Sequence, residues 1–242
     1  MHYRIIQDDA RRLKDYIDEP IDLVVTSPPY WDIKDYGVDG QIGHGQEYDE
    51  YIKDLVHIFS ACVDVIEPGG RICINVGEQY LSSSKYGRYR IQPIPHDLTV
   101  GLMQARNDID YMGSIIWNKI SNQNPSGGGK WMGSTYWPTE ILFTFEHEYI
   151  LIFRKHGKMP DAGDAILAAS KLTKEERSEW SRGIWQIPAV RGSEHPAPFP
   201  KELATRLIKM YSYFAGTVLD PCLLYTSPSP RDLSTSRMPS SA

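Results

Sequence analysis

Residues 22–31 read DLVVTSPPYW, an apolar run that passes directly into a Ser-Pro-Pro-Tyr turn. Residues 21–25 are apolar at nearly every position, which predicts a parallel strand buried on both faces. The two prolines fix φ and remove two backbone donors, so the turn offers carbonyl groups that only accept hydrogen bonds. Ligands of open α/β sheets bind at the carboxyl ends of the strands, so we expect the chemistry at this turn, with an amino group as its partner. A strand followed by a proline-rich exit loop that packs on the core is the alternative interpretation.

Helical and extended patterns alternate around this stretch. Residues 47–66 carry apolar side chains at three- and four-residue steps, which predicts an amphipathic helix that ends at the sequence EPGG of residues 67–70. The alternation predicts an α/β fold with a mostly parallel sheet and right-handed crossovers. We also expect strands at 3–6, 71–76, 111–117, 149–153 and 217–220, helices at 10–17, 97–106, 171–182 and 200–214, and a loop at 118–138.

The composition is that of one ordinary globular domain. The chain has 242 residues, of which 41% are hydrophobic and 24% charged, and its mean hydropathy is −0.41. There is no long apolar run and no signal-peptide pattern at the N-terminus, so we expect neither a membrane-spanning nor a secreted protein. Cys62, Cys73 and Cys222 are odd in number and widely separated, which predicts neither a disulfide framework nor a zinc site. The scattered histidines likewise predict no metal site, and a cytoplasmic location is expected.

Charge is distributed unevenly along the chain. Residues 1–60 contain 13 acidic and 6 basic side chains, a net of −7, and the whole chain carries −5, so the remainder carries +2. A surface that binds a polyanion is therefore expected after residue 60.

The sequence TSPPYW of residues 26–31, after a hydrophobic strand, resembles catalytic motif IV of the amino-group DNA methyltransferases. These enzymes methylate cytosine N4 or adenine N6 with S-adenosylmethionine, and the Ser-Pro-Pro-Tyr form is more typical of the cytosine N4 enzymes. The resemblance covers roughly residues 3–221 and includes QDD at 7–9, EPGGR at 67–71, FP at 199–200 and VLDP at 218–221. Because the catalytic motif comes first and the cofactor strand last, the order resembles the circularly permuted beta group. The resemblance implies a Rossmann-like methyltransferase fold.

The chemistry of the reaction suggests roles for the turn, Ser27-Pro28-Pro29-Tyr30. An exocyclic amine conjugated to its ring is a poor nucleophile, so the site must accept hydrogen bonds from its N–H groups and orient its lone pair. We assign the Ser27 hydroxyl oxygen and the Pro28 carbonyl as those acceptors, with Pro29 keeping the turn rigid. The target base must leave the duplex to be reached, and Tyr30 is expected to stack on it. Trp31 is expected to pack rather than to assist.

The resemblance also implies a cofactor site. In this interpretation Asp9 lines the cofactor pocket near the adenine, Phe199 covers it, and Asp220, followed by Pro221, contacts the methionine end. From the residues alone, Asp9 is as readily the N-cap of the following helix, and Asp220 a cap at the end of a strand.

The remaining expectations concern partners and the C-terminal sequence. Residues 1–221 form the expected methyltransferase domain, with target recognition between residues 120 and 191 and double-stranded DNA as the partner, and a restriction endonuclease partner is a further expectation. Lys119, Lys130 and Arg191 are the expected phosphate contacts. The family's Phe-x-Gly-x-Gly loop is absent after Pro221, and residues 222–242 are rich in Ser and Pro, so we expect a disordered, non-native tail and an incomplete cofactor unit. Adenine N6 methylation, an inactive DNA-binding remnant, and methylation of RNA or protein are the alternatives.

Overall fold

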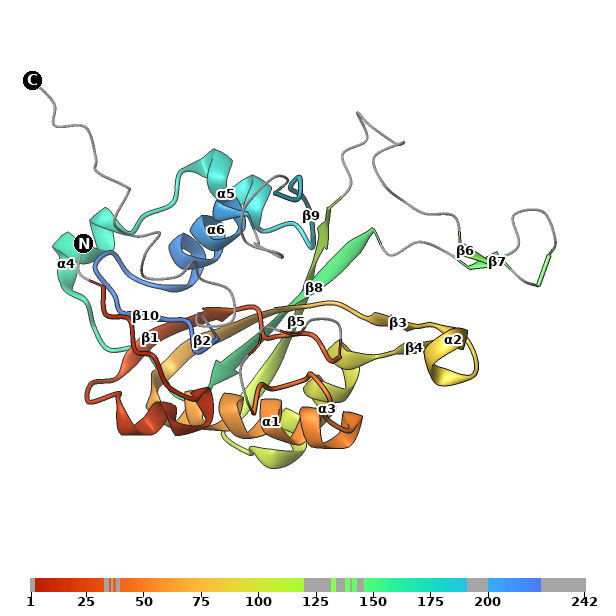
Figure 1. Ribbon diagram of the computed structural model, residues 1–242. Coiled ribbons are helices and arrows are strands. Elements are labelled where there is room, and N and C mark those ends of the chain that lie inside the picture. The colour runs from red at the N-terminus through yellow and green to blue at the C-terminus, as the bar shows by residue number, and fades with distance from the viewer. Residues whose placement is uncertain are drawn as a thin grey trace, which may run out of the picture.

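A six-stranded mixed sheet forms the centre of the molecule (Figure 1). The computed structural model describes residues 3–32, 35, 37, 40–119, 132–133, 138–139, 141–142, 146–190 and 200–222. The strand order is β10-β1-β2-β8-β5-β9. The strands are β1 (Ile21–Thr26), β2 (Ile66–Val76), β5 (Ile109–Asn118), β8 (His147–Lys155), β9 (Ile184–Gln186) and β10 (Val218–Leu219).

Strand β1 lies between two parallel neighbours, β10 and β2. Leu23 and Val24 point to opposite faces of the sheet, and both are 0% exposed. Burial on both faces explains the continuous apolar run, and the prediction of a parallel strand here is confirmed.

Helices cover both faces of the sheet (Figure 1). On one face, α1 (Tyr48–Val65), α3 (Ile94–Ala105) and the 3-10 helix η1 (Ala10–Asp15) form one hydrophobic core with the strands. On the other face, α6 (Lys201–Tyr211) packs on β1 and β2, near α4 (Gly163–Ala169) and α5 (Lys174–Trp180). The α/β fold class is therefore confirmed.

The apolar face that the sequence predicts for α1 is the face that is buried in the core. Tyr51, Leu55, Ile58, Phe59 and Cys62 are each 0% exposed, and they recur at three- and four-residue steps. The helix ends at Val65, as predicted, but Pro68 and Gly69 do not form a separate turn. Strand β2 begins at Ile66 and takes up these residues with a shift in its register against β1.

Strand β8 runs antiparallel to both of its neighbours, β2 and β5. The strand itself is predicted by the sequence, but its direction is not. A strand that neighbours the preceding strand of the same sheet, as β8 neighbours β5, needs no helical crossover and can reverse direction.

The N-terminal expectation is corrected by the structure. Residues 3–6 form no strand, and Tyr3 and Ile5 are 79% and 45% exposed. No described strand pairs with this segment, so its β-propensity is not realised. The next segment is helical, as predicted, but as the short η1.

Several short elements have no counterpart in the sequence prediction. These are a hairpin of β3 (Gln79–Leu81), α2 (Ser83–Tyr86) and β4 (Arg90–Gln92), the helix α4, the strand β9, and a pair of strands β6 (Met132–Gly133) and β7 (Ile141–Leu142). Elements of two to seven residues are too short to show a hydrophobic period.

Part of the segment expected to recognise the target belongs to the main sheet. Residues 147–190 supply β8 and β9, which flank β5. Most of the predicted loop at 118–138 lies outside the described residues, as do Lys130, Arg191, Phe199 and residues 223–242.

Cys62, Cys73 and Cys222 are buried, and none of the three is in a disulfide. No helix in the described part of the chain has the length and apolar character needed to cross a membrane.

Candidate active site

The Ser-Pro-Pro-Tyr turn begins where β1 ends, at the carboxyl edge of the parallel strands. Pro28 and Pro29 are buried, whereas Ser27 and Tyr30 are half-buried. The Tyr51 hydroxyl of α1 donates a 2.9 Å hydrogen bond to the Pro29 carbonyl. This bond anchors the turn to the core, and it leaves the Pro28 carbonyl without a described donor.

Trp31 closes the turn by packing, as predicted. Its side chain is 6% exposed, and its indole N–H donates to the Gln46 carbonyl at 2.8 Å. Its ring lies 5.2 Å from that of Tyr48 and 5.8 Å from that of Tyr86. Trp31 is therefore a structural support for the turn rather than a group at the reacting atoms.

Glu148 is a carboxylate of the site that sequence reasoning missed. Its side chain is 12% exposed and lies at the start of β8. Asn75 Nδ2 at the end of β2 donates to Oε2 at 2.6 Å, and Lys119 Nζ just after β5 donates to Oε1 at 2.8 Å. Three strands therefore contribute to one polar cluster, and Lys119 is held by a carboxylate rather than free to bind phosphate, contrary to the sequence expectation.

Tyr30 connects this cluster to Ser27. Burial raises the pKa of Tyr30 well above its ordinary value, and hydrogen bonding of its hydroxyl to Glu148 raises it further, whereas hydrogen bonding from Ser27 lowers it. Gly77 permits this approach, because a Cβ there would lie 3.1 Å from Glu148 Cγ and 3.7 Å from the Tyr30 hydroxyl oxygen. Ser27, Tyr30 and Glu148 thus lie close together at the carboxyl edge.

Asp220 lies beside the carboxyl end of β1. The Thr26 hydroxyl donates to its Oδ1 at 2.6 Å, and the backbone N–H of Cys222 donates to the same oxygen at 3.0 Å. Burial raises the pKa of Asp220, and the bond from Thr26 offsets part of this rise. The pairing of β10 with β1 therefore brings together two motifs that are 194 residues apart.

Asp9 caps η1, which is the alternative left open by the sequence. Its carboxylate accepts from the Arg11 backbone N–H at 2.9 Å and forms an ion pair with the Arg11 guanidinium, which lowers the pKa of Asp9. Asp9 also lines a cavity of about 90 Å³ together with Asp220 and Pro221. The Asp9 side chain therefore both caps η1 and lines the cavity.

The lining of this cavity suits a ligand with an aromatic part and a cationic part. Its walls combine carboxylates with apolar side chains from the N-terminal segment, η1 and β10, namely Ile5, Ile6, Ala10, Leu13, Ile17 and Leu219. Asp220 is half-buried, and both of these donors lie on Oδ1, which leaves Oδ2 as the acceptor for a further donor. S-adenosylmethionine, which carries an adenine, ribose hydroxyls and an ammonium group, fits this set of groups in its chemistry.

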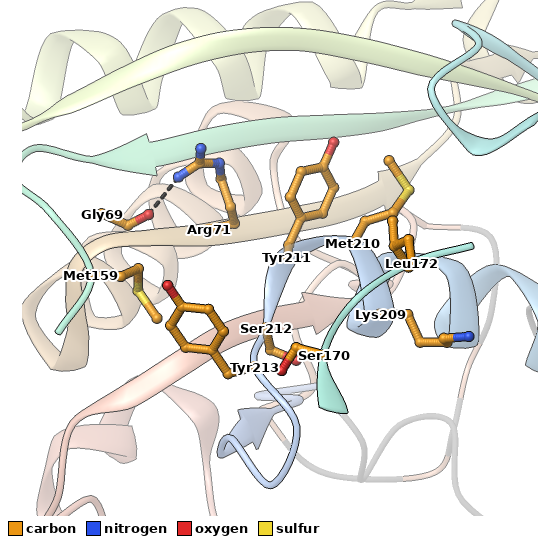
Figure 2. Close-up of a pocket in the computed structure, with 10 residues that line it drawn as sticks. All are labelled: Gly69, Arg71, Met159, Ser170, Leu172, Lys209, Met210, Tyr211, Ser212 and Tyr213. Carbon is orange, nitrogen blue, oxygen red and sulfur yellow. Dashed lines mark hydrogen bonds between the residues drawn. The ribbon is translucent and has the colours of Figure 1, made fainter. Parts of the chain in front are cut away.

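A larger cavity, of about 280 Å³, lies at the opposite, amino edge of the sheet (Figure 2). Gly69 and Arg71 at the start of β2 line it, and the Arg71 guanidinium lies 5.9 Å from the Tyr211 ring. Burial lowers the pKa of Arg71. Lys209 points away from Arg71 in Figure 2 and pairs with Glu176. This cavity is separated from the Ser-Pro-Pro-Tyr turn by the length of the strands, so its size does not make it the active site.

Within the described ranges, no three His, Cys, Asp or Glu side chains are grouped so that they could hold a metal ion.

Comparison with known proteins agrees with this arrangement. A family model described as DNA methylase matches residues 21–223. The chain is 33% identical to the type II methyltransferase M.MjaI of Methanocaldococcus jannaschii, over 92% of this chain and 80% of that protein. It is 32% identical to M.SmaI of Serratia marcescens, over 90% of this chain and 78% of that protein.

Solved structures give the same result. A DNA modification methylase of Thermus thermophilus, TTHA0409, crystallised with S-adenosyl-L-methionine, superposes with a TM-score of 0.67 and 33% identity, over 89% of this chain and 78% of that one. The cytosine-N4-specific PvuII DNA methyltransferase has a TM-score of 0.57 at 17% identity, which shows the shared fold.

The fold, the turn and these matches define an S-adenosylmethionine-dependent DNA methyltransferase. The chain belongs to the N6/N4 DNA methylase family.

Proposed function

We propose that the protein methylates cytosine N4 in double-stranded DNA. One observation carries this proposal: a Ser-Pro-Pro-Tyr turn, of the kind more typical of cytosine N4 enzymes, stands at the carboxyl edge of β1 next to the Asp220 carboxylate. Ser27 is the residue that favours cytosine over adenine, since the adenine N6 enzymes more often carry Asp or Asn at this position.

Two acceptors in the turn prepare the target amine. The Ser27 hydroxyl and the Pro28 carbonyl accept its two N–H groups, which turns the nitrogen lone pair out of conjugation with the ring and holds it in one direction. S-adenosylmethionine, when bound, supplies a methyl group made electrophilic by the adjoining sulfonium. Because the amine becomes more acidic as the new N–C bond forms, acceptors already in place stabilise the positive charge that develops on its N–H groups, and the proton is released to water after the methyl group has left the sulfonium.

The hydroxyl of Tyr30 sets the direction of Ser27. If Ser27 donates its own proton inward to the Tyr30 oxygen and Tyr30 donates onward to Glu148, the lone pairs of Ser27 face the target amine. Asn75 and Lys119 hold Glu148 in place for this role. The ring of Tyr30 is the surface on which the flipped base stacks.

The cofactor is held on the other side of β1. Asp220 and Pro221 contact its methionine end, Asp9 lies near its adenine, and Phe199 covers it. The half-buried Asp220 carboxylate is suited to an ammonium group, because a cation nearby restores the charged form that burial disfavours.

Recognition of the DNA sequence is assigned to residues 120–146. This is the part of the expected 120–191 segment that precedes β8 in the sequence. A restriction endonuclease as biological partner and a cytoplasmic location complete the proposal.

The test is methylation of duplex DNA followed by digestion to nucleosides and mass analysis. We expect N4-methylcytosine, and at least about tenfold less of it from Ser27→Ala at matched protein concentration and a matched short reaction time. N6-methyladenine without N4-methylcytosine would assign adenine as the target. Preferential labelling of RNA or protein in competition with duplex DNA would move the substrate outside DNA.

A further inference from the structure

The β3–α2–β4 hairpin, residues 79–92, carries the most basic uninterrupted stretch next to the active site. From Gln79 to His96 the sequence contains Lys85, Arg88 and Arg90 and no Asp or Glu. The hairpin continues from the end of β2 and extends beyond the sheet (Figure 1).

The hairpin is fixed to the residues that follow the catalytic turn. Lys85 forms an ion pair with Asp32, and the Tyr86 hydroxyl donates to the same carboxylate at 2.7 Å. Tyr86 also packs on Trp31, and Leu81 is 0% exposed in the core below. This hairpin, residues 79–92, is called the arm below. It is therefore held in one position relative to the Ser-Pro-Pro-Tyr turn.

Two arginines of the arm have no acidic partner among the described residues. Arg88 and Arg90 are exposed, and no carboxylate in that part of the chain pairs with either. Arg90 instead lies 5.9 Å from the Tyr86 ring, a cation–π contact that does not use its N–H groups as hydrogen-bond donors to a carboxylate. Tyr89 between them is 56% exposed. Both guanidinium groups can therefore be reached by an anionic ligand.

We infer that this hairpin is a DNA-binding arm, in which Arg88 and Arg90 contact the phosphate backbone beside the flipped base. Extruding a base requires the flanking backbone to be held, and unpaired guanidinium groups bind phosphate with geometric specificity. The arm starts two residues beyond Gly77, which lies against Tyr30, so it adjoins the turn at which the base would react. The inference rests on duplex DNA being the substrate, as proposed above.

The charge asymmetry of the chain supports phosphate as the occupant. The first 60 residues carry a net charge of −7, whereas the arm adds two arginines without an acidic partner among the described residues, beside the turn where the reaction is proposed to take place. Neither arginine is engaged in the core, so both can be replaced without loss of folding.

The experiment measures binding of the full chain to a fluorescein-labelled 30-base-pair duplex of mixed sequence across a range of salt concentrations. We expect the double variant R88Q/R90Q to bind several-fold to tens of times more weakly at low salt. The slope of log K against log salt should fall by about 0.9 for each phosphate that the variant no longer neutralises. Binding of S-adenosylmethionine, measured by calorimetry, should stay equal to that of the parent.

A matched control removes two charges elsewhere. Lys158 and Lys171 are exposed at the amino edge, beside residues that line the larger cavity, so K158Q/K171Q should leave the slope unchanged. If both double variants lower the slope equally, or if neither does, the inference that the arm contacts DNA phosphates is refuted, while the proposed reaction stands. If the parent binds no duplex at low salt, the arm and the DNA reaction fail together.

Discussion

The contact between Glu148 and Lys119 should contribute measurably to folding stability. The two groups lie 2.8 Å apart, with 12% and 29% of their side chains exposed. Exposed ion pairs contribute about 0.2–1 kcal/mol, whereas removing one partner of a fully buried pair costs about 3–5 kcal/mol. Their partial burial places this pair between the two, so we expect a coupling energy of about 1–2 kcal/mol.

A double-mutant cycle measures that energy. Glu148→Gln keeps the shape and one acceptor for Asn75, and Lys119→Met keeps the length of the aliphatic stem. The free energy of unfolding of each variant comes from urea denaturation. We expect each single change to cost about 1–2 kcal/mol and the double variant to cost about as much as the worse single one. Additive losses, with a coupling below about 0.5 kcal/mol, would show that the cluster is only a surface contact and would refute the argument.

A second double-mutant cycle, between Tyr30 and Glu148, tests whether Glu148 also positions Ser27 for the reaction. If Glu148 orients Ser27 through Tyr30, then Tyr30→Phe, which keeps the ring, should reproduce the rate loss of Glu148→Gln, and the two changes together should cost little more than one. Because the pKa of Tyr30 is raised, its hydroxyl stays protonated and this loss should not vary with pH between about 6 and 9. Base stacking, reported by 2-aminopurine fluorescence at the target position, should be retained in both variants.

Three further outcomes follow from the site. Ser27→Ala should lower the single-turnover methylation rate roughly ten- to a thousandfold with an unchanged melting temperature, and an unchanged rate would remove Ser27 from the reaction. Trp31→Ala should destabilise the fold by about 3–5 kcal/mol, measured by urea denaturation, because a 6%-exposed indole leaves a cavity. Burial raises the pKa of Asp220 above 3.8, so cofactor affinity by calorimetry should fall as the pH drops through the raised pKa and the carboxylate becomes neutral. Asp220→Asn should bind weakly with no such pH dependence, and an unchanged dependence would assign the titration to another group.

The parts of the fold that the sequence predicts are those in which a local pattern is also the buried pattern. The α1 helix shows its period because each of its apolar positions contacts the sheet, and β1 shows none because both of its faces are covered. The turn could be located in the same way, since Ser-Pro-Pro-Tyr is contiguous in the sequence. Residues 3–6, by contrast, have the composition of a strand, and only the absence of a described neighbouring strand decides that they are not one.

The cofactor side was predicted through resemblance, and its geometry depends on strand order. The hydrogen bond from Thr26 to Asp220 exists because β10, the last strand described, pairs with β1, the first. Periodicity identifies both strands but carries no information about which strands are neighbours. The double role of Asp9, as helix cap and cavity wall, likewise depends on which segments are neighbours in space, and periodicity does not show this.

Glu148 could not be found from sequence because its role depends on the direction of one strand. In β8 it is the second residue, and the antiparallel pairing of Val76 with Tyr149 places that end of β8 at the carboxyl edge of β2. Had β8 run parallel, as the alternating pattern predicts, residue 148 would lie at the amino edge, about 20 Å away at roughly 3.3 Å per residue. The reversed strand is therefore what places a carboxylate beside the Ser-Pro-Pro-Tyr turn, where the proposed mechanism uses it to position Ser27 through Tyr30. A methyltransferase sheet that is parallel throughout would present the same turn without that support.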